Sequence, residues 1–175
     1  YPTHGAGPVA TVLDINRGNR FDTLVSMSTK SNGLHEYIVN HPEGGEDHPH
    51  AGIEWKLGDV VTTLIKTANG ETILVTHDTN LPRPYSLNFS VQGTKGLTDL
   101  ERHSGRIYVE GISQAHAWDD MNEGWLEKYD HPLWERYGEY AEGSGHGGMD
   151  FFVLNAFVES VKRKVNPPLD AYDAA

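Results

Sequence analysis

The amino-acid sequence predicts an α+β fold, a mostly antiparallel open-faced sheet with helices packed on one face. Segments typical of strands fill the middle of the chain, an Asn-Gly turn at 69–70 joins two of them, and the C-terminal part has the apolar spacing of helices. With 175 residues the chain can bury a core of its own, and we expect one domain over residues 1–175.

The N-terminal region predicts a short helix, a strand and a long loop. Residues 5–15 have helical spacing, and Pro8 suits the first helical turn, where an N–H is dispensable. Residues 20–29 are rich in strand formers. The polar segment 30–52 predicts a loop with one helical turn near residues 34–39.

The middle of the chain predicts a series of antiparallel strands. The strongest signal is a hairpin in which Asn69-Gly70 joins two strands. The expected strands are residues 60–67, 72–78, 85–93, 96–100 and 106–110.

The C-terminal region predicts helices. Residues 124–140 form a helical stretch that Pro132 divides, because proline suits the first turn of a new helix. Residues 149–164 form an amphipathic helix that ends before Pro167-Pro168. Its expected apolar face consists of Phe152, Ala156, Phe157 and Val161.

Composition excludes several classes of partner and site. The chain has 14 basic and 25 acidic residues, a net charge of -11, which argues against binding to nucleic acid or to an anionic membrane. It has no cysteine, so disulfides and thiolate metal sites are excluded. No run of 18 apolar residues predicts a membrane span, and we expect a soluble protein whose compartment stays open.

The chain opens on a candidate site motif, with Tyr1 and His4 at the start of the first helix. Imidazole can act as general acid, general base or hydrogen-bond donor near neutral pH. The alternative is a capping or packing histidine. Since no start methionine or signal peptide precedes the motif, we expect a fragment of a longer protein.

A proline-stiffened loop, Leu81-Pro82-Arg83-Pro84-Tyr85, forms a second candidate. Rigid loops at the ends of strands often carry binding residues, and here Arg83 and Tyr85 would be held in place. The alternative is a simple turn with the tyrosine packed inward.

A metal site is not expected. His48, His50 and Glu54 have the H-x-H-x3-E spacing of a cupin metal motif. The glycines that flank that motif are missing, because position 42 is proline and position 61 is valine. A solvated loop explains these histidines better.

A glycine-rich segment, residues 143–148, precedes the last long helix. Glycines there let backbone N–H groups approach an anion. No Lys-Ser/Thr follows, so the segment is not a Walker P-loop, and no G-x-G-x-x-G follows a strand. His146 and Asp150 are candidate ligand contacts, although Asp150 is also favoured by the helix dipole.

Taken together, several motifs resemble one known group of enzymes, the glucose–fructose oxidoreductase / inositol dehydrogenase superfamily, in its C-terminal domain. Within that superfamily the sequence is most similar to the family 109 glycoside hydrolases, the NAD-dependent α-N-acetylgalactosaminidases. The matching segments are Tyr1-Pro2-Thr3-His4-Gly5-x-Gly7-Pro8, Asp14-Ile15-Asn16-Arg17-Gly18, Gly145-His146-Gly147-Gly148-Met149-Asp150-Phe151 and the tail Pro167–Ala174.

The resemblance implies a two-domain enzyme in which an N-terminal Rossmann domain holds NAD and this chain shapes the sugar pocket. It implies transient oxidation at C3 of the sugar, loss of the C2 proton and elimination of the aglycone. By the same resemblance His4 is the catalytic residue, and Tyr1, Tyr85, His146 and Asp150 bind the substrate. No cofactor is expected in this chain alone.

Two other functions stay open. The domain could belong to an NAD(P)-dependent sugar dehydrogenase, which also moves a hydride at a ring carbon. It could instead be a non-catalytic carbohydrate-binding or oligomerisation module, whose open sheet face contacts a second subunit.

Overall fold

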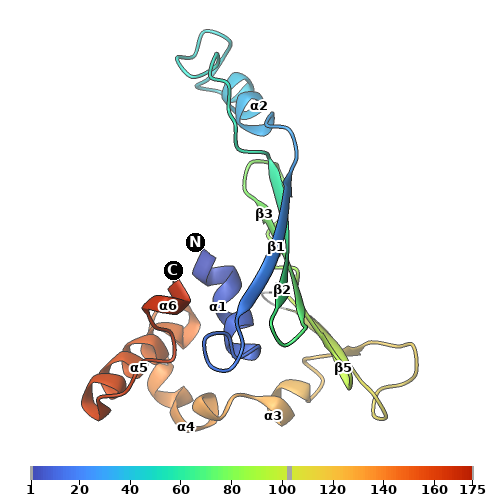
Figure 1. The fold of residues 1–175 in the computed structure, drawn as a ribbon, viewed down its shortest axis with the longest axis vertical. Helices are drawn as coiled ribbons and strands as arrows, with labels where there is room; N and C mark the ends of the chain where they lie inside the picture. The colour runs from blue at the N-terminus through green and yellow to red at the C-terminus, as the bar shows by residue number, and fades with distance from the viewer. Residues whose placement is uncertain (1, 102–103, 175) are drawn as a thin grey trace. The chain divides into compact units, whose positions relative to one another are not determined.

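The computed structural model describes residues 2–101 and 104–174 (Figure 1). The chain divides into two compact units, Tyr1–Arg83 with Asn166–Ala175, and Pro84–Val165. The expectation of a single domain stays a prediction. No helix among the described residues is both long and apolar enough to cross a bilayer.

The first unit is a three-stranded antiparallel sheet with three helices. The strands lie in the order β1-β2-β3, and the Asn69-Gly70 turn joins the last two, with Gly70 at a φ of 106°. Figure 1 shows α2 beyond the end of the sheet at which β1 ends. The elements are α1 (Pro2–Val12), β1 (Phe21–Ser28), α2 (Gly33–Asn40), β2 (Val60–Thr67), β3 (Thr72–Asp78) and α6 (Ala171–Ala174).

The two faces of this sheet differ in exposure. Register places Leu64 between Val25 and Leu74, in a row whose side chains are all exposed. Ile73 points to the opposite face and is buried. Side chains alternate between the two faces along a strand, so one face of the sheet carries an uncovered apolar row.

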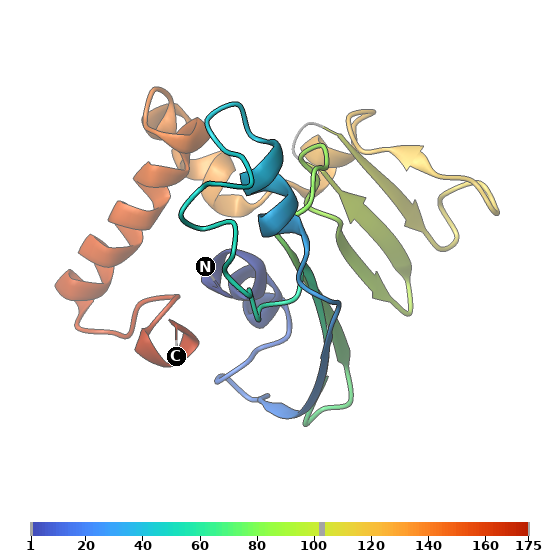
Figure 2. The same ribbon diagram turned by 90° about the horizontal axis from the view of Figure 1, so that it is seen from above.

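The second unit joins an antiparallel sheet to a group of helices. The four strands lie in the order β4-β5-β6-β7, drawn in yellow-green to yellow in Figure 2. The elements are β4 (Phe89–Gly93), β5 (Gly96–Leu100), β6 (Gly105–Val109), β7 (Asp119–Asp120), α3 (Trp125–Tyr129), α4 (Pro132–Ala141), the 3-10 turn His146–Gly148 and α5 (Met149–Arg163).

The predicted α+β class is confirmed, although the strands form two sheets instead of one. The prediction that a strand begins at residue 85 was wrong, because β4 begins at Phe89. The Glu101 carboxylate accepts hydrogen bonds from the backbone N–H groups of Leu87 and Asn88 and from the Ser86 hydroxyl. These N–H groups are therefore occupied by a side chain instead of a neighbouring strand. The same bonds hold the pKa of Glu101 below its usual range.

The first helix is displaced from its predicted bounds. It begins at Pro2, so Pro8 lies inside the helix and not in its first turn. It ends at Val12, and Asp14 and Asn16 then adopt positive φ angles of 53° and 63°. A left-handed residue cannot continue a right-handed helix, which explains the early end.

The last long helix packs mainly through aromatic rings. Phe152 meets Trp134 of α4 edge-on with ring centroids 4.5 Å apart, and Phe151 lies 6.2 Å from Tyr137. Of the predicted apolar face, Phe152 and Ala156 are partly buried, but Phe157 and Val161 are exposed. The side of α5 that packs is therefore set by contacts with α4.

Candidate functional site

His4 lies in α1 with an exposed side chain. An exposed imidazole is not packed in an apolar core, and its catalytic role stays a prediction. The helix around it is weak, because Gly5 and Gly7 flank the site and Pro8 has no N–H to donate to the His4 carbonyl. Tyr1 lies outside the described residues.

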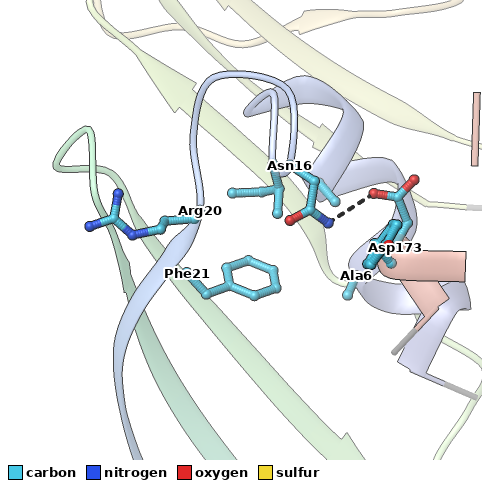
Figure 3. A pocket seen from close by; sticks show the side chains of 8 residues that line it. Ala6, Asn16, Arg20, Phe21 and Asp173 are labelled. Carbon is cyan, nitrogen blue, oxygen red and sulfur yellow. Dashed lines mark hydrogen bonds between the residues drawn. The ribbon is translucent and has the colours of Figure 1, made fainter. Parts of the chain in front are cut away.

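A pocket of about 250 Å³ lies between α1, the start of β1 and α6 (Figure 3). The Asn16 amide in it donates to the Asp173 carboxylate at 3.2 Å, and Arg20 points away from both. Two of its polar side chains, Asn16 and Asp173, are thus bonded to each other, which is typical of a joint between segments. The lining residues are Ala6, Ala10, Ile15, Asn16, Arg20, Phe21, Tyr172 and Asp173.

Beside this pocket Arg17 anchors the C-terminal tail to the turn after α1. Its Nη1 and Nη2 donate to the two carboxylate oxygens of Asp173 at 2.9 and 2.7 Å, and Nη2 also donates to the Pro168 carbonyl at 2.9 Å. The Asp173 side chain is only 1% exposed. These bonds, chiefly the one from Arg17, hold the pKa of Asp173 well below its usual range.

The two residues of the proline-rich loop have different surroundings. Arg83 Nη1 lies 3.5 Å from Asp78 Oδ2, at the end of β3. Tyr85 is 70% exposed. This exposure contradicts the alternative in which the tyrosine packs inward, and it leaves the ring accessible to a ligand.

His146 and Asp150 form a dyad at the start of α5. His146 Nδ1 lies 2.9 and 3.1 Å from the two Asp150 carboxylate oxygens, and the imidazole is 82% exposed. Three successive left-handed residues, His146, Gly147 and Gly148, set this geometry, with φ angles of 53°, 68° and 99°. A carboxylate at Nδ1 orients the ring and directs Nε2 outward, as a hydrogen-bonding or proton-exchanging group requires.

The described residues contain no group of three His, Asp or Glu side chains that could hold a metal. His48 and His50 lie with ring centroids 5.3 Å apart, and His48 Nδ1 accepts a hydrogen bond from the His50 backbone at 3.2 Å. That bond occupies His48 Nδ1 and leaves its Nε2 unassigned.

The glycine-rich segment does not fit a dinucleotide. It connects α4 to α5, whereas a nucleotide-binding glycine turn joins a parallel strand to a helix. Both sheets of the described residues are antiparallel. The described residues therefore contain no Rossmann-type glycine turn, and the expectation that NAD is held outside this chain stays a prediction.

Comparison with known proteins identifies the chain's relatives. The model of the glycosyl hydrolase 109 C-terminal domain matches residues 1–175. Over the whole chain the sequence is 53% identical to an alpha-N-acetylgalactosaminidase of Tannerella forsythia and 52% identical to a glycosyl hydrolase family 109 protein of Parabacteroides distasonis. A Stenotrophomonas maltophilia member of that family is 51% identical over 174 residues, 99% of this chain.

The chain spans 36 to 37% of the length of these three relatives. The family model matches every residue of the chain, and the sequence identity to these relatives is above 50%. The chain belongs to glycosyl hydrolase family 109 and corresponds to the C-terminal domain of that family.

Proposed function

We propose that this chain is the substrate domain of an NAD-dependent glycosidase that hydrolyses N-acetylgalactosaminides. The observation that carries the proposal is the 53% identity, over the whole chain, to a protein named alpha-N-acetylgalactosaminidase. The exposed imidazole of His4 supports it, because the family resemblance assigns the catalytic role to this histidine.

The cofactor belongs, in this proposal, to polypeptide outside the 175 residues, since the sheets of the described residues are antiparallel and carry no Rossmann-type strand–glycine turn–helix. When bound, NAD would supply reversible removal of hydride from C3 of the sugar. His4 exchanges the proton of the C3 hydroxyl. Tyr1, Tyr85, His146 and Asp150 hold the sugar by hydrogen bonds, for which phenols, imidazole and carboxylate are suited.

An aryl α-N-acetylgalactosaminide separates the glycosidase from a sugar dehydrogenase. The full natural polypeptide should release the phenol while the NADH concentration stays constant. Accumulating NADH without phenol would make the protein a dehydrogenase. A full-length gene without a strand–G-x-G-x-x-G–helix ahead of this chain would favour the non-catalytic module instead.

Tyr85→Phe tests the sugar-binding role of the exposed phenol. Loss of the hydroxyl should leave a polar partner on the sugar unpaired and weaken binding by about 1–3 kcal/mol. Steady-state kinetics should show this as a raised KM for the aryl glycoside. Tyr140→Phe, at another exposed tyrosine, is the matched control. An unaltered KM in Tyr85→Phe would assign the phenol no part in binding.

We also propose that the exposed face of the β1–β3 sheet contacts a second copy of this chain. Its centre is the apolar row Val25, Leu64 and Leu74. The charged strand residues on this face are Lys66 and Asp78, one of each sign and at opposite ends of the sheet. Asp78 is already paired with Arg83, so apolar contact between the two copies, and not an ion pair, would hold them together.

Leu74→Lys should convert the protein to a smaller species in sedimentation velocity, because it places a charge in the centre of an apolar contact. Leu24→Lys is the matched control, since Leu24 is 61% exposed, close to the 68% of Leu74, but lies on the opposite face. If the wild-type protein sediments as a monomer, or if both variants behave alike, this face is not the contact.

A further inference from the structure

We propose that the Arg17–Asp173 ion pair is a positioning device that holds α1, and with it His4, in its working geometry. This inference rests on the proposed function, because it gives the C-terminal tail a role in the reaction through His4. The turn after α1 and the C-terminal tail, whose Arg17 and Asp173 are 156 residues apart in sequence, thereby act together.

Helix α1 needs support from outside, because its own sequence favours the helix weakly. Gly5 and Gly7 each cost about 1 kcal/mol relative to alanine. Pro8, inside the helix, removes the N–H that would bond to the His4 carbonyl. The turn that carries the imidazole is therefore the least self-supporting part of the helix.

The tail supplies that support. Among the described elements, α6 is the one that packs most closely on α1. It has four residues, too few to be a stable helix alone. Asp173 secures it by accepting from Asn16 and Arg17 of the turn after α1, and from the Asp170 backbone at 2.9 Å. Figure 3 shows the hydrogen bond between Asn16 and Asp173.

The geometry of the pair suits precise positioning. Arg17 engages both carboxylate oxygens, and a planar two-bond fork fixes orientation as well as distance. The Asp173 side chain is only 1% exposed, so little solvent reaches its carboxylate, whereas the Arg17 side chain is 38% exposed. A small shift of a catalytic group can cost as much as about a hundredfold in rate.

The test is a double-mutant cycle in the full natural polypeptide. Asp173→Asn should lower kcat for the aryl glycoside by about tenfold, and the same change in a His4→Ala background should cost nothing further, because both act through one group. A merely structural role would lower activity by the same factor in both backgrounds. An equal loss of kcat in the wild-type and His4→Ala backgrounds, or no loss of kcat in the wild-type background, would overturn the proposal.

A second readout is independent of activity. Asp173→Asn should accelerate amide hydrogen exchange across α1, since its opening becomes easier. Arg17→Lys, which keeps the charge but breaks the fork, should do the same if Asp173→Asn fails to fold. Unchanged exchange in α1 overturns the proposal. If His4→Ala keeps full activity while exchange rises as expected, the catalytic role of His4 fails and the support of α1 by the tail stands.

The chain offers a matched control in the ion pair of Arg106 with Asp99. Arg106 Nε and Nη2 donate to Asp99 Oδ2 at 3.0 and 2.7 Å, and both side chains lie in the second unit. Asp99→Asn should leave kcat and the exchange of α1 unchanged. Equal effects of Asp99→Asn and Asp173→Asn would show a general response to a lost ion pair and contradict the positioning role.

Discussion

His4→Ala in the full natural polypeptide should lower kcat by roughly 10²-fold or more, because proton transfer by a positioned side chain contributes on that order. The prediction follows from the exposed imidazole on α1 and from the proposed exchange of the C3 hydroxyl proton. The measurement is release of the phenol from an aryl α-N-acetylgalactosaminide at saturating substrate.

His77→Ala is the matched control, since His77 is an exposed histidine on β3 that has no assigned role. It should leave kcat unaltered. Addition of imidazole to the His4→Ala variant should recover part of the lost rate if the missing group is a proton-transfer catalyst. A His4→Ala variant with full turnover would remove this residue from the mechanism.

Gly148→Ala should lower the free energy of unfolding of the chain by about 2–4 kcal/mol. Gly148 has a φ of 99°, and a Cβ there would lie 2.9 Å from Trp134 Cη2 and 3.2 Å from the Cβ of Ala141. The added methyl group would strain the backbone and overpack the joint between α4 and α5. Urea unfolding of wild type and variant measures the difference.

Gly143→Ala separates the cost of backbone strain from the cost of overpacking. Gly143 has a similarly left-handed φ of 79°, but nothing lies within 4 Å of a Cβ built there. Its substitution should cost only the backbone strain, about 1 kcal/mol. Equal losses in the two variants would show that the Trp134 contact adds nothing, contrary to the packing account of this motif.

Local sequence signals predicted the elements whose stability is local. The β2–β3 hairpin has its expected bounds because the Asn69-Gly70 turn fixes the register by itself. Pro132 likewise begins α4, since proline fits the first helical turn. Elements that depend on distant partners were predicted less well: residues 85–88 form no strand, with the backbone N–H groups of Leu87 and Asn88 bound to Glu101, and α6 was not predicted at all.

The residues of the candidate site were likewise predicted only where a local motif marked them. His4, Tyr85 and His146 were identified from motifs, and all three are exposed. The 14–18 and 167–174 segments were noted only for their family resemblance, because no local pattern reveals that Arg17 binds Asp173. A lone Arg and a lone Asp so far apart carry no spacing signal, and only the folded chain shows their pairing.

The isotope content of N-acetylgalactosamine released in D₂O distinguishes elimination from direct displacement. If this chain serves a glycosidase that works through C3 oxidation and elimination, the C2 proton is lost to solvent, and the released sugar should carry deuterium bound to C2. A product with only protium at C2, formed with steady phenol release, would contradict the account and indicate direct displacement at the anomeric carbon.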